Sequence, residues 1–264
     1  MTTTQPIGDL LRNWRQRRRL SQLDLALEAE ISARHLSFLE TGRSQPSREM
    51  ILQLAERLEV PLRDRNILLV AAGYAPIFPE RLLSDPALAA ARKVIDTILT
   101  GHEPHPALAV DRHWTIVAHN KAIGPLLEGV SEVLLRPPIN ALRLALHPDG
   151  VAPRIGNHAE WRAHLLSRLH RQIELSADRE LALLFEELAA YPKPDGVAQR
   201  ATTSREPGIA VPLHLETSHG PLAFISTTTV FGTPIDITLA ELALETFFPA
   251  DETTAAIMRR LVIG

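Results

Sequence analysis

The stretch LSQLDLALEAEISARHLSFLETG, residues 20–42, predicts two short helices joined by a tight turn. Ser21 and Ser32 are placed to cap these helices, because a serine hydroxyl can accept a hydrogen bond from a free amide of the opening turn. Gly42 is placed to end the second helix in a left-handed conformation. We therefore expect a helical hairpin that begins at Ser21 and ends at Gly42.

The second of these helices has two different faces. At about 100° per residue, Leu36 and Leu39 lie on an apolar back. The opposite side mixes small, polar, cationic and aromatic residues: Ala33, Arg34, Ser37, Phe38 and Thr41. A small exposed helix of this kind suits the major groove of DNA. An ordinary helical hairpin with no DNA-binding role is the alternative.

Helical patterns continue on both sides of the hairpin. Ile7, Leu10, Leu11 and Trp14 are spaced for a helix over residues 7–18, and further helices are expected from residue 47 and over residues 62–72. The prolines within residues 74–79 end this pattern. Five short helices predict one all-α domain over residues 1–79, followed by a second domain over residues 80–264.

Charge and composition narrow the class of protein. Residues 1–84 contain 12 Arg, no Lys and 10 acidic residues, a net charge of +2, whereas the rest of the chain carries −5. Four of these arginines, at 15, 17, 18 and 19, precede the hairpin and form either a phosphate-facing patch or a solvated face. No cysteine is present, which excludes thiol catalysis and cysteine-based zinc fingers. No apolar run is long enough to span a membrane and no signal peptide is recognised, so we expect a cytoplasmic protein.

The N-terminal pattern resembles the phage-repressor-type (XRE) helix-turn-helix family. The resemblance rests on residues 20–22, 25–26, 31–32, 39–43, 46–47 and 54–55 and spans about residues 7–73. It implies that Gln22 anchors a phosphate and that Arg15 pairs with Glu40. It also implies that the second helix of the hairpin faces the groove. The candidate DNA-binding residues are Gln22, Ser32, Ala33, Arg34, His35, Ser37, Phe38 and Arg43.

Three positions in this region leave alternatives open. Glu30 stands where the family usually carries glycine, so the turn is either strained by about 1 kcal/mol or differs in geometry. Arg34 either reads guanine through two parallel hydrogen bonds or contacts phosphate only. Phe38 either touches a thymine methyl or packs against the neighbouring helix, and His35 lies at the edge of the groove-facing side.

The second region changes from helical to mixed patterning. Helices are expected over residues 85–101, 120–127 and 140–146, then from Asn157, which forms a capping box with Glu160, and over a segment that ends before Pro192. Strands are expected at 107–110, 114–118, 209–215 and 222–231. Residues 237–248 favour a strand with a helix as the alternative, and Asp251 caps a final helix. The expected fold class is thus α + α/β, a five-helix domain followed by a PAS-like α+β domain with an antiparallel sheet and helices on one face.

The second region also resembles the ligand-binding domain of MmyB-like transcription regulators. The resemblance rests on residues 146–150, 160–161, 164–166 and 247–251 and covers about residues 86–263. It implies a cavity suited to lipophilic small molecules such as fatty acids. The candidate ligand-binding residues are Trp114, Ile116, His147, Trp161, Leu165, Phe185, Phe224 and Phe231. Plain core packing is the alternative for the apolar ones, and simple turn chemistry is the alternative for His147 beside Asp149.

Together these patterns predict a sequence-specific DNA-binding transcriptional regulator that senses a small lipophilic ligand. We expect it to be a homodimer on a double-stranded DNA operator, because one helix pair covers few base pairs. A metal-responsive regulator is an alternative, since 11 histidines are present and His102 and His105 are closely spaced. However, His158, His164 and His170 recur every six residues, which scatters them around a helix. An enzyme is a weaker alternative, because no nucleophile or phosphate-binding motif is found, and we expect no catalytic residue, metal or cofactor.

Overall fold

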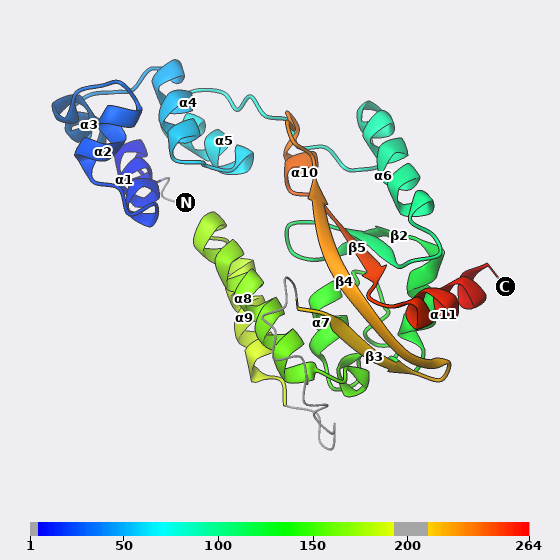
Figure 1. Ribbon diagram of the computed structural model, residues 1–264. Coiled ribbons are helices and arrows are strands. Elements are labelled where there is room, and N and C mark those ends of the chain that lie inside the picture. Colours follow the sequence, from blue (N-terminus) through cyan, green and yellow to red (C-terminus); the bar gives the residue numbers. More distant parts are fainter. Residues whose placement is uncertain (1–4, 193–210, 264) are drawn as a thin grey trace. The chain divides into compact units, whose positions relative to one another are not determined.

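The computed structural model describes residues 5–192 and 211–263. The chain divides into two compact units (Figure 1). One consists of the residues up to Arg81 together with the short segments Glu174–Ser176 and Thr233–Ala240, and the other consists of the remainder. The N-terminal region contains the helices α1 (Ile7–Arg17), α2 (Gln22–Glu28), α3 (Ala33–Glu40), α4 (Arg48–Arg57) and α5 (Leu62–Ala71).

These five helices enclose one apolar core. Each contributes the side chains that its periodicity places inward, so that Leu11, Leu25, Leu36, Leu54 and Leu68 are almost completely buried. Burial of this kind is the main stabilising contribution in a small helical domain. The predicted all-α arrangement and the inward faces of its helices are therefore confirmed.

The second region is built on one antiparallel sheet of five strands in the order β2-β1-β5-β4-β3. In its register, Leu108 lies opposite Glu245 and Phe224 lies opposite Pro249. The strands are β1 (Ala107–Val110), β2 (Ile116–His119), β3 (Leu213–Thr217), β4 (Gly220–Val230) and β5 (Ala243–Pro249). The later helices of the chain are α6 (Ala89–Gly101), α7 (Ala141–Leu146), α8 (His158–Ser176), α9 (Arg179–Ala190), α10 (Ile237–Ala240) and α11 (Glu252–Val262), with 3-10 helices at Pro86–Leu88, Lys121–Leu127 and Ala152–Arg154. Of these, α10 and the last three residues of α8 belong to the first unit.

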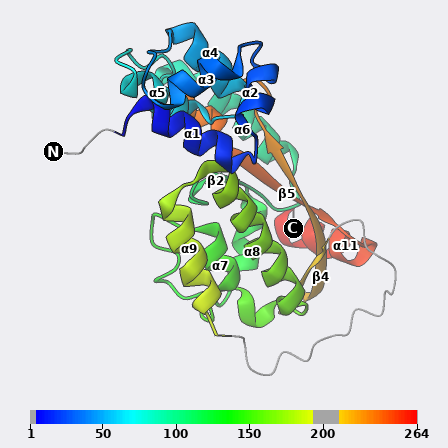
Figure 2. The ribbon, with the colours of Figure 1, turned by 90° about the vertical axis from the view of Figure 1, so that its left-hand side faces the viewer.

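Helices pack on both faces of this sheet, which corrects the expectation of one covered face. Successive strand residues point to opposite sides. Leu108 and Val110 join a core with α8 and α9, whereas Ala107 and Ala109 join a second core with α6. Figure 2 shows α7, α8 and α9 lying beside one another.

Several expected elements differ in detail. Residues 237–248 are neither one strand nor one helix, because they divide into α10 and β5. The strand expected at 114–118 begins only at Ile116, and the part of the strand expected at 209–210 lies outside the described residues.

Two predicted caps are wrong. The Asn120 side chain binds the backbone of Ala107, Leu99 and His105, and the segment after it is a 3-10 helix.

The second wrong cap is Asn157, which makes no side-chain cap hydrogen bond to α8. Its amide oxygen accepts a hydrogen bond from the His214 backbone at 3.1 Å, and its amide nitrogen donates to the Pro212 carbonyl at 2.7 Å. The Glu160 carboxylate receives a longer 3.2 Å bond from the same amide. Asn157 thus ties the start of α8 to β3, and tertiary contacts override the local capping pattern.

Candidate DNA-reading surface and ligand cavity

The starts of α2 and α3 are fixed by local hydrogen bonds. The Ser21 hydroxyl accepts from the Asp24 amide at 3.1 Å and the Asp24 carboxylate accepts from the Ser21 amide at 2.9 Å, which completes a capping box. The Ser32 hydroxyl accepts from the His35 amide at 3.1 Å. Both predicted serine caps are confirmed, as is the left-handed Gly42, with φ +72°. Glu30 is also left-handed, with φ 54°, so the turn adopts the conformation that favours glycine.

A buried ion pair fixes α3 against α1. Arg15 donates from Nε to Glu40 Oε1 at 2.6 Å and from Nη2 to Oε2 at 2.8 Å, and Gln22 Nε2 donates to the same Oε2 at 2.9 Å. Burial alone raises the pKa of Glu40, but the hydrogen bonds from Arg15 and Gln22 outweigh it, so the pKa lies below its usual value. The implied pairing of Arg15 with Glu40 is present. The Gln22 amide is engaged by the same carboxylate, at the N-terminus of α2.

The outward face of α3 carries an aromatic ring between two arginines. The guanidinium carbon of Arg34 lies 5.3 Å from the Phe38 ring centroid and that of Arg43 lies 5.9 Å from it. Both arginines are exposed and Phe38 is half-buried. Of the other candidates, Ser32 is exposed, whereas Ala33, His35 and Ser37 are half-buried. This surface presents two cations beside one aromatic ring, and guanidinium groups are the chemistry that binds phosphate or guanine.

The second region contains an apolar cavity of about 120 Å³ between the sheet and its helices. Four of the predicted ligand-binding residues line it, namely Trp114, Ile116, Trp161 and Leu165. The remaining lining residues are Leu108, Ile123, Leu126, Leu127, Ala141, Leu142, Leu144, Ala145, Val151, Ile155, Arg168, Leu213, Leu215, Ser226, Glu245 and Phe247. A concave, largely apolar site with few polar groups is typical of small-molecule binding.

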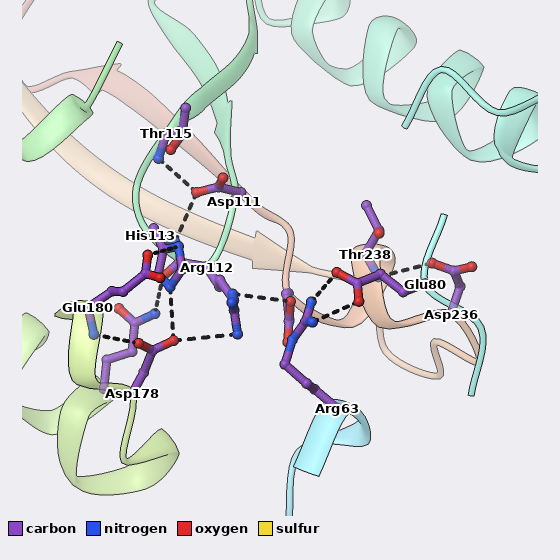
Figure 3. Close-up of polar contacts among 12 residues, drawn as sticks. Arg63, Glu80, Asp111, Arg112, His113, Thr115, Asp178, Glu180, Asp236 and Thr238 are labelled. Carbon is purple, nitrogen blue, oxygen red and sulfur yellow. Dashed lines mark hydrogen bonds and ion pairs between the residues drawn. The ribbon is translucent and has the colours of Figure 1, made fainter. Parts of the chain in front are cut away.

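Trp114 is held in this wall by the turn between β1 and β2. It has φ 66°, and its indole nitrogen donates to Gln172 Oε1 at 2.9 Å. The Asp111 carboxylate accepts from the backbone amides of His113 and Thr115 at 2.9 and 2.8 Å, which shapes the turn (Figure 3). A left-handed tryptophan is a rare conformation that persists only where its surroundings impose it.

The turn is also anchored to the start of α9. His113 Nε2 lies 2.9 Å from the Asp178 carboxylate, and the Arg112 guanidinium lies 3.5 Å from it (Figure 3). Asp178 itself caps α9, accepting from the Glu180 amide at 2.8 Å. Burial raises the pKa of Asp178, but the His113 and Glu180 hydrogen bonds outweigh it, so the pKa lies below its usual value. The anchored turn keeps the Trp114 indole over the cavity.

One polar cluster, formed by Arg168, Thr228 and Glu245 and called the polar pole below, interrupts the apolar wall of the cavity. Arg168 on α8 donates to both carboxylate oxygens of Glu245 on β5, at 3.0 Å from Nη1 and 2.5 Å from Nη2. The Thr228 hydroxyl donates to Glu245 at 3.1 Å and accepts from Arg168 at 2.7 Å. The Trp114 ring centroid lies 4.7 Å from the Arg168 guanidinium carbon, a cation–π contact.

The other four predicted ligand-binding residues do not line the cavity. Phe224 is fully buried behind Phe247, with ring centroids 6.3 Å apart. Phe231 packs with the α6 core on the opposite face of the sheet. Phe185 packs beside His170, and His147 stacks edge-on against Tyr191 while accepting a hydrogen bond from the Asp149 amide at 3.0 Å. This placement of His147 matches the alternative of simple turn chemistry.

The polar pole was not predicted, although helical and strand spacing is consistent with the position of each of its residues. Arg168 follows Trp161 by seven residues and Leu165 by three, so helical spacing places all three on one face of α8. Glu245 and Phe247 share one face of β5, whereas Leu244 points to the other. Charged residues are usually read as solvent-facing, and only the pairing across two elements reveals that these two line a cavity.

Within residues 5–192 and 211–263, no three histidine or acidic side chains are grouped so as to hold a metal ion. His102 instead stacks on His105 and Phe248. None of the described helices combines the length and apolar character needed to cross a membrane.

Two known families match the two regions of the chain. The family described as helix-turn-helix matches residues 11–64, and the family described as MmyB-like transcription regulator ligand binding domain matches residues 91–261. None of the curated proteins compared with the chain matches it. The two matched regions together describe a ligand-responsive transcription regulator. The chain therefore belongs to the MmyB-like transcription regulators, with a DNA-binding helix-turn-helix at its N-terminal end and a ligand binding domain after it.

Proposed function

We propose that α3 enters the major groove of a specific operator and that Arg34 reads a guanine there. The supporting observation is the exposed Arg34–Phe38–Arg43 surface on a helix whose back is fixed by the Arg15–Glu40 pair. A bidentate arginine–guanine contact supplies sequence discrimination, while Arg43, Ser32 and the α2 N-terminus position the protein on phosphates. Ala33, His35 and Ser37 complete the contact surface.

The protein acts as a homodimer in this proposal. One helix pair contacts only a few base pairs, and two copies would reach half-sites about one helical turn, or roughly 34 Å, apart. The ligand binds one arrangement of the dimer more tightly and thereby shifts its population, since a ligand shifts an equilibrium only through differential affinity. No catalytic step is part of this function.

The ligand is a small lipophilic molecule held in the cavity beside Trp114, Ile116, Trp161 and Leu165. The apolar wall supports this class of ligand, because burial of apolar surface drives such binding. Fatty acids belong to the same broad class and are included in the panel of ligands to be tested.

Two measurements test the function. Selection of bound sequences from random oligonucleotides with the full chain is expected to yield an operator with two related half-sites. Titration of the protein–operator complex with lipophilic compounds is expected to change the dissociation constant of the protein for that operator. Recovery of no preferred sequence would refute DNA reading by α3, and an operator affinity that no cavity-bound compound alters would refute ligand control.

A further inference from the structure

The chain leaves the helix-turn-helix domain through residues 77–81, a segment named the strap below. The strap contains no helix or strand, yet each of its residues is bound by a polar group of another segment. Asn66 on α5 fixes the first two residues. Its Oδ1 accepts from the amides of Ile77 and Phe78 at 3.0 and 3.1 Å, and its Nδ2 donates to the Phe78 carbonyl at 2.7 Å. A segment tied down in this way does not behave as a flexible coil.

The second half of the strap is held by side chains from two other segments. Glu80 accepts two hydrogen bonds from Arg63 on α5, at 2.7 and 2.5 Å (Figure 3). The Arg81 guanidinium donates to the Asp236 carboxylate at 2.8 Å, and the Thr238 hydroxyl donates to the Arg81 carbonyl at 2.5 Å. The Asp236 side chain is 3% exposed, so Arg81 supplies the counterion of a buried carboxylate.

The partners of Arg81 belong to residues 233–240, a segment named the arm below. Its helix α10 also binds the middle of the strap, because the Ile237 amide donates to the Pro79 carbonyl at 2.9 Å. The arm belongs to the same compact unit as the strap and α5, although 155 residues separate Arg81 from Asp236 along the chain. The strap is therefore clamped between α5 and the arm.

The arm is inserted between two strands that contribute to the cavity. Ser226 on β4 and Glu245 and Phe247 on β5 are lining residues. The arm is joined to β4 by residues 231–232 and to β5 by residues 241–242. The same two strands that a cavity ligand would contact thus lead directly into the segment that binds the strap.

Both connections are anchored by apolar side chains. Phe231 and Leu242 pack in the core that α6 forms with the sheet, and Leu242 is 2% exposed. Short, anchored connections leave the arm little freedom to move independently of the ends of β4 and β5. A displacement of these strand ends either carries the arm and the strap with it or breaks the hydrogen bonds between them, which costs free energy.

We infer that residues 233–240 are the coupling arm of this regulator, which transmits a change in β4 and β5 at the cavity to the strap at the exit of the DNA-binding domain. Arg81, Asp236 and Thr238 are its positioning residues, since they touch neither the cavity ligand nor DNA. The inference rests on the proposed function, in which the ligand controls operator binding. It adds the route by which that control travels.

The test uses operator DNA alone, because coupling between two binding sites is reciprocal. Hydrogen exchange of the full chain is measured by mass spectrometry with and without the operator duplex recovered by selection. In the wild type we expect the duplex to slow exchange in α3 and also to change the exchange rate of β5, residues 243–247, severalfold. In the double variant Arg81→Gln with Thr238→Val, we expect the change in β5 to be lost while the protection of α3 remains.

The matched control is Arg171→Gln with Thr253→Val, which makes the same two changes at exposed positions on α8 and α11, outside the strap and the arm. It is expected to keep both responses. Thermal unfolding shows whether the double variant is folded, and if it is not, Thr238→Val alone is measured and is expected to reduce the response of β5.

Two outcomes would overturn the coupling arm while leaving DNA binding intact. One is a wild-type protein in which the operator protects α3 but does not alter β5. The other is a folded variant whose β5 response equals that of the control. Recovery of no operator from the selection is a different result, because it refutes the proposed function and the coupling arm with it.

Discussion

Arg34 and Phe38 lie one turn apart on α3, with the guanidinium carbon 5.3 Å from the ring centroid, and Arg43 approaches the same ring from the loop after the helix. The ring limits the conformations of two long side chains that would otherwise lose entropy on binding. This preorganisation favours directional contacts from Arg34, since the cost of ordering an arginine side chain is reduced before DNA arrives.

Arg34→Ala is expected to separate specific from non-specific binding. Loss of a bidentate guanine contact costs about 1–3 kcal/mol of discrimination, so affinity for the selected operator falls roughly 5- to 150-fold. Affinity for unrelated DNA changes much less. Gel-shift or anisotropy titrations on both DNAs at one salt concentration measure this difference.

Arg57→Ala is the matched control, because Arg57 is exposed and lies on α4, outside the α2–α3 pair. It removes the same charge and is expected to affect both DNAs equally and slightly. Equal losses of specific and non-specific affinity in Arg34→Ala would show that Arg34 contacts phosphate without reading bases.

Glu30→Gly is expected to stabilise the protein by about 0.5–1 kcal/mol. Glu30 has φ 54°, a conformation in which glycine avoids the steric cost of a Cβ, although glycine also loses more backbone entropy on folding. Glu28→Gly lies in α2, where glycine costs about 1 kcal/mol, and is expected to destabilise. Urea unfolding of the two variants therefore gives opposite signs, and destabilisation by Glu30→Gly would show that the glutamate makes a compensating contact.

These positions also show which parts of the structure the sequence encodes locally. The roles of Ser21, Ser32 and Gly42 are predictable because each acts through backbone groups within a few residues. The prediction for Asn157 is wrong because its amide finds partners in and beside β3, more than fifty residues later. Local rules describe a residue only where no distant partner competes for it.

The residues near the cavity show the same limit of prediction from local sequence. The sequence pattern predicts Phe224 and Phe231 in one wall, yet they are seven residues apart, and an odd separation along a strand places side chains on opposite faces. Arg168 and Glu245 escape prediction because their charges indicate solvent exposure. The ion pairing that makes their burial tolerable joins α8 to β5 and has no signal in either segment alone.

Glu40→Ala is expected to destabilise the protein by about 3–5 kcal/mol. The Glu40 side chain is fully buried, and its removal leaves Arg15, 11% exposed, without its counterion. Chemical denaturation measures the change in the free energy of unfolding. Glu28→Ala, at an exposed position, is the control and is expected to change stability by less than about 0.5 kcal/mol. A loss in Glu40→Ala no larger than that of the control would contradict a structural role for the pair.

Acid is expected to weaken the same contact. The pKa of Glu40 is lowered in the folded protein, so its contribution to stability is present above the ordinary value of 4.5 and is lost as the pH falls below it. The free energy of unfolding of the wild type should decrease from about pH 5 downward. The slope in Glu40→Gln should be smaller, because the amide side chain introduced there does not titrate, and identical slopes would show that the carboxylate does not contribute.

Ala145→Leu is expected to block the cavity while leaving operator binding intact. Ala145 lies on α7 and lines the cavity, so a leucine there occupies space that a ligand would need, in a helix that tolerates it. The variant should lose the ligand response of the operator complex, yet retain its operator dissociation constant without ligand. Ala163→Leu, at an exposed position of α8, makes the same change outside the cavity and should retain both properties. A ligand response that survives in a folded Ala145→Leu protein would place the ligand elsewhere, because overpacking of this wall leaves no room for it.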